Sequence, residues 1–295
     1  DTRVEGLISS ATYNNYTYRG ITVAGNLQNP NFDGRLTVRD PNANFTFDGL
    51  IDVSDEIHTY DFTAEIDHID LGKLNFLQDT SAVLKGKVVM DMRGTNIDDT
   101  GGVIAFTEAS FENSNDLYEF QDFVITSGFR RGIRTITMNS PDIISGQVSG
   151  VFKIGDLKAL FQNAVGSLYT NYEPRKITEN QFMDFNIQIY SKIVEVLVPD
   201  IELEPDTFVR GSVVSDDSEF KLTFRSPRIK AFGVLAEAIN VRVDNKNPLF
   251  NAYVEADSIG TGIYGVSDFN LINVTLKDTL FIRSEFKGGP QRQDN

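Results

Sequence analysis

The stretch DPNANFTFDGLIDVSD, from Asp40 to Asp55, alternates between two kinds of residue. Small or apolar residues occupy every second position from Ala43 to Val53, and most residues between them are polar. Such alternation predicts a β-strand with one apolar face. A single strand of about eleven residues would reach roughly 36 Å, well beyond the usual strand of a globular protein. The question for the fold is what covers so long an apolar face.

Segments with the same period recur along the whole chain and are separated by turn residues. We count on the order of fifteen strands, including the alternating segments 194–198 and 272–276. They predict a mainly β fold: a long, curved, antiparallel-rich sheet that forms an open tube-like or taco-like groove with an apolar interior. The same alternation fits a closed β-sandwich or barrel equally well. We expect one continuous segment over residues 1–295.

One segment has the period of a helix. In DLKALFQNAVGSLY (156–169), apolar residues fall at i, i+3, i+4, i+7, i+8 and i+11 from Leu157, the stripe of an amphipathic helix. Asp156 is placed to cap its N-terminus. The segment 228–239 fits a second short helix and a strand equally well.

The composition narrows the classes of function. The net charge of −15 argues against nucleic acid and against electrostatic docking on anionic lipid headgroups. The chain has no cysteine, which excludes disulfides and thiol catalysis. No apolar run approaches eighteen residues. The chain opens with neither an initiator Met nor an apolar leader, so we expect a piece of a longer protein.

The residues that carry chemistry form no convincing site. GTGIYG (260–265) fits a dinucleotide-binding pattern, which requires a helix after it. The segment that follows has the alternation of a strand, which favours a hairpin turn. His58 and His68 would lie about 33 Å apart on one strand, too far to share a metal ion. The acidic pairs 98–99 and 216–217 lack calcium-loop spacing and favour solvated turns. We predict no enzyme, no catalytic residue, no metal and no cofactor.

Three passages carry a resemblance to a known family. They are GNLQNPNFDGRLTVRDPNANFTFDGLID (25–52), YEFQDFVITSGFRRGIRTITMNSPDIISGQVSGVFKIGDLKALFQNAVGSLYTNYEP (118–174), and the pair NKNPLFNAYVEADSI and SDFNLINVTLKDTLFIRSEFKGG within 245–289. In this order they resemble the TamB family, the periplasmic subunits of the bacterial translocation and assembly module, within the AsmA-like superfamily.

The resemblance implies a location, a ligand and a partner. Proteins of this family are anchored in the inner membrane of Gram-negative bacteria and cross the periplasm towards the outer membrane. Their apolar β-groove is thought to conduct phospholipid, and their C-terminal domain meets an outer-membrane barrel of the TamA or BamA type. Neither the anchor nor that domain is visible in this sequence, so the resemblance implies an interior periplasmic segment that contacts phospholipid acyl chains.

A continuous row of apolar side chains suits this role because it hides acyl chains from water. A sixteen-carbon chain exposed to water costs roughly 12 kcal/mol, at about 0.8 kcal/mol per methylene. The helix at 156–169 would plug or brace the open side. The residues that we predict to line the groove are Phe45, Phe47, Ile51, Val53, Tyr60, Phe62, Ile66, Leu84, Val88, Met90, Phe152, Ile154, Phe185, Ile187, Ile189, Val194, Val196, Leu222, Phe224, Val241, Val254, Val274 and Leu276.

Two other classes of function stay open at this point. An assembly factor would use an unpaired edge strand to template outer-membrane β-proteins by strand addition. A closed β-sandwich adhesin or carbohydrate-binding module would instead have a dry, filled core.

Overall fold

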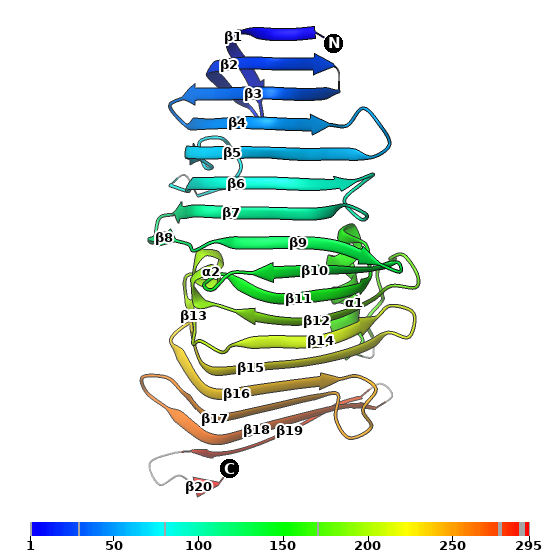
Figure 1. Ribbon diagram of the computed structural model, residues 1–295. Coiled ribbons are helices and arrows are strands. Elements are labelled where there is room, and N and C mark those ends of the chain that lie inside the picture. The colour runs from blue at the N-terminus through cyan, green and yellow to red at the C-terminus, as the bar shows by residue number, and fades with distance from the viewer. Residues whose placement is uncertain are drawn as a thin grey trace. The chain divides into compact units, whose positions relative to one another are not determined.

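The computed structural model describes residues 2–28, 30–79, 81–169, 171–276, 279–288 and 293–294. The chain is mainly β, and its strands form one large antiparallel sheet that is not closed into a barrel (Figure 1). This agrees with the predicted class of fold. Contacts group the chain into two units, Asp1–Gly128 with Met138–Pro141 and Phe129–Thr137 with Asp142–Asn295. We describe each unit by itself.

Unit 1 consists mainly of long strands. Its strands are β1 (Thr2–Tyr13), β2 (Tyr16–Gln28), β3 (Asn31–Asp40), β4 (Ala43–Asp52), β5 (His58–Asp70), β6 (Val83–Gly94), β7 (Gly101–Glu112), β8 (Leu117–Glu119) and β9 (Phe123–Arg130), whose last residues fall in unit 2. The longest connection between two of them, from β5 to β6, covers residues 71–82. From β1 to β7 each strand pairs antiparallel with the next along the chain. Both β8 and β9 pair with β7.

The described residues of unit 2 form two α-helices in addition to strands. Its elements are β10 (Ile133–Asn139), β11 (Ile144–Val151), η1 (Ile154–Asp156), α1 (Leu157–Gly166), β12 (Phe182–Ile189), α2 (Ser191–Leu197), β13 (Ile201–Leu203), β14 (Phe208–Val214), β15 (Glu219–Ala231), β16 (Val234–Asp244), β17 (Ala252–Gly260), β18 (Gly265–Leu276), β19 (Thr279–Gly288) and β20 (Gln293–Asp294). The strands β11, β12, β14, β15, β16, β17, β18 and β19 pair antiparallel in that order.

Local turn chemistry produces this hairpin order. Three two-residue turns have positive φ at both positions: Asn14–Asn15, Arg131–Gly132 and Phe232–Gly233. This backbone is that of the type I′ turn, whose twist matches that of the flanking strands. The first turn is also held from outside, because the Asn14 amide donates to the carbonyl oxygens of Leu74 and Asn75. Such turns make each strand pair with its neighbour in sequence.

The core of unit 1 lies at one end of its strands. Ile21, Val23, Val38 and Ala43 are buried there against Leu74 from the β5–β6 connection. The adjoining turn is fixed by Asp40, which is 5% exposed and accepts hydrogen bonds from the Tyr16 hydroxyl at 2.5 Å and from backbone N–H groups.

Acid should weaken this end of unit 1. Burial alone would raise the pKa of Asp40, but hydrogen bonds from Tyr16 and from the backbone N–H groups of Asn42 and Arg19 hold it below its usual value. A carboxyl with a lowered folded pKa stabilises the native state above its unfolded pKa, and this contribution is lost as pH falls through the folded pKa. We expect Asp40→Asn to lower the urea midpoint at pH 7 and to lower it much less at pH 3. An equal loss at both pH values would contradict this assignment.

Secondary structure differs from the sequence prediction in several places. The described residues contain twenty strands, more than the fifteen or so that we counted. The predicted helix at 156–169 is confirmed as α1, though shorter, and Asp156 makes no capping hydrogen bond; its carboxylate accepts from the backbone N–H of Thr178 and the amide of Gln181 instead. The ambiguous segment 228–239 is a hairpin of β15 and β16.

One predicted strand is wrong. Val194 and Val196 lie in α2 and not in a strand. Alternate valines give the period of a strand, but Ile193, Val194 and Leu197 fit one helical face as well, and over seven residues the two periods are hard to separate.

Candidate functional site

The register of unit 1 places its apolar side chains on one face of the sheet, which we call the apolar face. Residues that lie directly opposite one another form rows across the strands. The Phe47 row runs over eight strands and consists of Gly6, Val23, Leu36, Phe47, Ala64, Val88, Phe106 and Phe123. Seven inter-strand steps of about 4.8 Å make this row roughly 34 Å long. The predicted alternation therefore becomes a continuous apolar strip.

A second row contains three facing glycines, and we call it the glycine row. It consists of Val4, Gly25, Gly34, Gly49, Phe62, Met90, Ile104 and Ile125. Since glycine has no side chain, neighbouring aromatic rings close over these positions. The ring centroids of Phe32 and Phe47 are 5.9 Å apart, and those of Phe47 and Phe62 are 4.9 Å apart.

Most of the predicted lining residues of unit 1 share this face. The register brings together nine of them, and all except the buried Phe47 are partly exposed. They are Phe45, Phe47, Ile51, Tyr60, Phe62, Ile66, Leu84, Val88 and Met90. In the described part of unit 1 no helix covers them. Val53 lies outside this set because β4 ends at Asp52.

The corresponding face of unit 2 is covered by α1. Phe152, Leu160, Met183, Phe185 and Val213 form a buried cluster in which the helix packs on the sheet. The helix also makes polar contacts, because the Thr275 hydroxyl donates to the carbonyl oxygen of Leu168, just beyond the end of α1. The helix was predicted to plug or brace the open side, and it lies on the apolar side of this sheet.

Apart from Val194 and Val196 of α2, the predicted residues of unit 2 are divided between three surroundings. Phe152, Ile154, Phe185, Ile187 and Leu222 belong to the cluster under α1 or pack against it. By register, Ile189, Phe224, Val241 and Val254 share this face.

Val274 and Leu276 lie on the opposite, polar face. Asn273 is opposite Ala252 and therefore lies on the apolar side. Val274 and Leu276 are one and three residues further along β18, so their side chains point to the other face. The prediction of a strand at 272–276 was correct, but the alternation did not indicate which face of the sheet its apolar residues occupy.

Several residues of the apolar faces escaped the sequence prediction. In unit 1 they include Ile21, Val23, Leu36 and Val38 on β2 and β3, and Ile104, Phe106, Phe123 and Ile125 on β7 and β9. The signal was present in ITVAGNL (21–27) and GGVIAF (101–106), where apolar residues and glycines alternate with others. Glycine belongs to the apolar face here because it lies in register with Phe62 and Met90.

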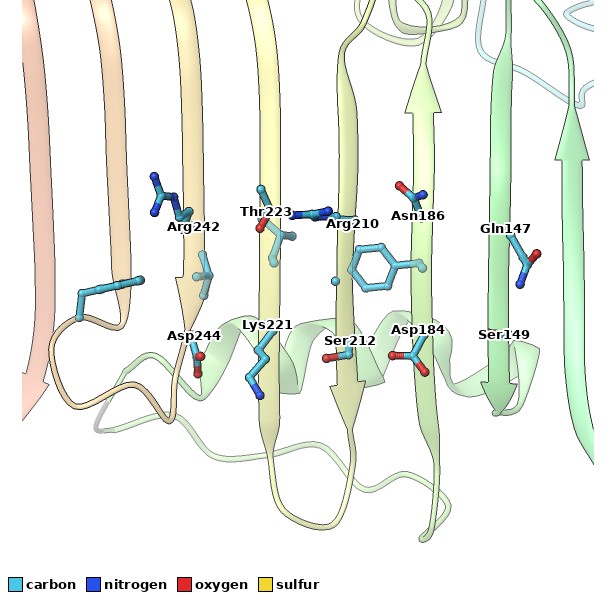
Figure 2. A pocket seen from close by; sticks show the side chains of 15 residues that line it. Gln147, Ser149, Asp184, Asn186, Arg210, Ser212, Lys221, Thr223, Arg242 and Asp244 are labelled. Carbon is cyan, nitrogen blue, oxygen red and sulfur yellow. The ribbon is translucent and has the colours of Figure 1, made fainter.

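The polar face of unit 2 carries two adjoining hollows. The first, of about 680 Å³, crosses β11, β12, β14, β15 and β16, and the second, of about 480 Å³, shares Asn186 and Arg210 with it. Figure 2 shows two ranks of polar side chains in the first hollow, with α1 on the far side of the sheet. The Arg210 row consists of Gln147, Asn186, Arg210, Thr223 and Arg242. The Asp184 row consists of Ser149, Asp184, Ser212, Lys221 and Asp244.

Two of the three cations in these rows are already paired. The Lys221 ammonium contacts the Glu219 carboxylate at 2.5 Å, and this hydrogen bond raises the pKa of Lys221. The Arg242 guanidinium contacts Glu255 at 3.3 Å. A hydrogen bond from the Tyr253 hydroxyl is the largest influence on Glu255 and lowers its pKa. Arg210 is the third cation of these rows.

The other sequence candidates lie apart from these surfaces. GTGIYG spans the turn between β17 and β18, as predicted, and a strand follows it. His58 and His68 both lie on β5, near its two ends. The pairs 98–99 and 216–217 are in turns. Among the described residues, no group of three or more histidine, aspartate or glutamate side chains is placed to hold a metal ion.

Comparison with family models, curated proteins and solved structures gives no match. The described helices are all too short or too polar to cross a membrane. Two kinds of surface are therefore the candidate sites of this chain: the apolar faces and the polar hollows.

Proposed function

We propose that this chain is a segment of a lipid conduit, in which phospholipid acyl chains travel along the apolar face. In this proposal it belongs to an inner-membrane-anchored protein of the TamB type, lies in the periplasm of a Gram-negative bacterium and works with an outer-membrane barrel of the TamA or BamA type through regions outside these residues. The observation that carries the proposal is the apolar face of unit 1, which spans eight strands in continuous rows, and the described residues of unit 1 contain no helix to cover it.

The energetics favour an acyl chain as the occupant. A methylene group leaving water gains about 0.8 kcal/mol, so a ligand that covers these rows with its own tail is stabilised along its whole length. Along the Phe47 row, the successive strands β4, β5 and β6 present Phe47, Ala64 and Val88, which offer similar apolar contact without a polar interruption. An acyl tail could then advance from one strand to the next with little change in free energy.

Site-specific photocrosslinking tests this proposal. We expect a photoreactive phenylalanine analogue at Val88 or Met90 to crosslink phospholipid in Gram-negative cells, at least several times more than the same analogue at Val89. Val89 is the matched control, because it lies between them on β6, faces the polar side opposite Thr63 and is 40% exposed. Random contact with lipid would label Val89 at least as strongly. Equal labelling at the three positions, or no lipid adduct at Val88 and Met90, would reject the conduit.

One observation favours the assembly factor as a second candidate. β1 lies at one end of the sheet in unit 1, and eleven of its twelve residues are exposed, including Leu7 at 74% (Figure 1). A long exposed edge can accept an additional strand. This candidate depends on backbone hydrogen bonds, so proline at Leu7 should abolish it and leave lipid crosslinking at Val88 unchanged. The third candidate, a closed sandwich, has less support because the described strands form one sheet.

A further inference from the structure

The lipid proposal makes no use of the polar face of unit 2, where the two hollows lie. The centre of this face holds polar side chains without a partner among the described residues. Other cations of β15 are paired, as in Arg228–Glu204 and Lys230–Glu202. Within the part of the chain that the structure describes, no side-chain hydrogen bond or ion pair joins Arg210, Asn186 or Asp184 to another residue.

The chemistry of the open groups identifies a class of ligand. Arg210 offers only donors, Asp184 offers only acceptors, and the amides of Gln147 and Asn186 offer both. An anion would need donors alone and would be repelled by Asp184 and Asp244. Hydroxyl groups donate and accept, so a ligand rich in hydroxyls can satisfy every member of the two rows. The mixture of charges favours a ligand that is itself neutral.

The spacing of the groups identifies its shape. The Arg210 row presents one polar side chain per strand over five strands, which is about 19 Å at roughly 4.8 Å per step. A β-linked hexose chain advances by close to one such step per sugar. An extended peptide advances by about 3.3 Å per residue and would fall out of register within two strands. A linear glycan therefore matches the row better than a peptide.

Aromatic side chains lie in both hollows. Phe250 lines the first hollow, and Phe208 lines the second beside Asn186 and Arg210. An aromatic ring offers an apolar surface on which the C–H face of a sugar ring can pack while its hydroxyls reach polar neighbours. We propose that the polar face of unit 2 binds a linear, neutral oligosaccharide of β-linked hexose units, which lies across the strands along the Arg210 row.

Isothermal titration with defined oligosaccharides tests the site. The probes are cellohexaose and chitohexaose, with α-linked maltohexaose and acidic oligogalacturonate as comparisons. We expect saturable binding of at least one β-linked neutral hexamer, weaker binding of the two comparison sugars, and a loss of affinity of tenfold or more in Arg210→Ala and Asn186→Ala. Arg35→Ala is the matched control, since Arg35 lies on the polar face of unit 1 and pairs with Asp48. It should bind like the wild-type chain.

Each other outcome rejects the site. No saturable binding of either β-linked hexamer, binding that both variants retain, or a preference for oligogalacturonate would overturn the proposal. Arg210 and Asn186 are exposed and their side chains have no partner, so their truncation should leave the fold intact, which the far-UV circular dichroism spectrum will verify. The sugar site and the apolar face of unit 1 use different residues. Lipid crosslinking at Val88 should therefore be unchanged in both variants, and either proposal can fail without the other.

Discussion

Replacing Phe185 with alanine is expected to lower the free energy of unfolding by about 3–5 kcal/mol, the usual cost of removing a buried phenylalanine side chain. The side chain is 7% exposed, and its ring centroid lies 5.8 Å from that of Phe161 on α1. Its far edge occupies the space over Gly211, where a Cβ would lie 2.7 Å from the ring. The substitution therefore opens a cavity between the sheet and the helix that small neighbours cannot fill.

Urea unfolding followed by circular dichroism will measure this loss. The control is Phe281→Ala, in which the same atoms are removed from a side chain that is 54% exposed, and the expected change is within about 0.5 kcal/mol. A loss below about 1 kcal/mol in Phe185→Ala would mean that α1 is not held by this contact. The variant is also expected to increase amide exchange in α1 more than in β4, which lies in unit 1.

Gly49→Ala is expected to destabilise the chain by more than about 2 kcal/mol, although it adds a single methyl group. The φ of Gly49 is +141°, a conformation open almost only to glycine, and a Cβ there would lie 2.6 Å from the Cα of Phe62. The opposing backbone would have to move, and the rings of Phe47 and Phe62 lie over it. Gly6→Ala is the control, because no atom lies within 4 Å of its Cβ position. Similar urea midpoints for the two variants would refute a special role for the glycine row.

The alternation of β4 and β5 was enough to predict long strands with one apolar face, and the stripe of α1 was enough to predict a helix. Both results follow from local periodicity, which the sequence contains directly. The face shared by two strands depends on their register, and bulges alter it. One such irregularity lies between Ile66 and Ile69 of β5, where the pairing with β6 shifts and the apolar side chain after Ile66 is Ile69 instead of His68. Sequence alternation alone could not place Val274 and Leu276 for the same reason.

The polar hollows were not predicted at all. Gln147, Asn186 and Arg210 are ordinary polar residues of three different strands, and nothing in the spacing of 147, 186 and 210 indicates that they form one row. The row exists only because α2 and β13 lie outside the ladder between β12 and β14, so that these two strands pair directly, while β13 pairs with β15. Long-range register is a property of the folded sheet and has no short-range signature.

The sequential pairing of strands from β1 to β7 has a consequence for how such a chain can change in length. Each of these strands forms its ladders with the strands before and after it in sequence, so adding or removing two strands together would let the flanking ladders rejoin in the same direction. Adding or removing a single strand would reverse the direction of everything that follows and exchange the two ends at which the connections emerge. The architecture can therefore gain or lose whole hairpins, and we expect deletion of β3 with β4 to be tolerated better than deletion of β3 alone.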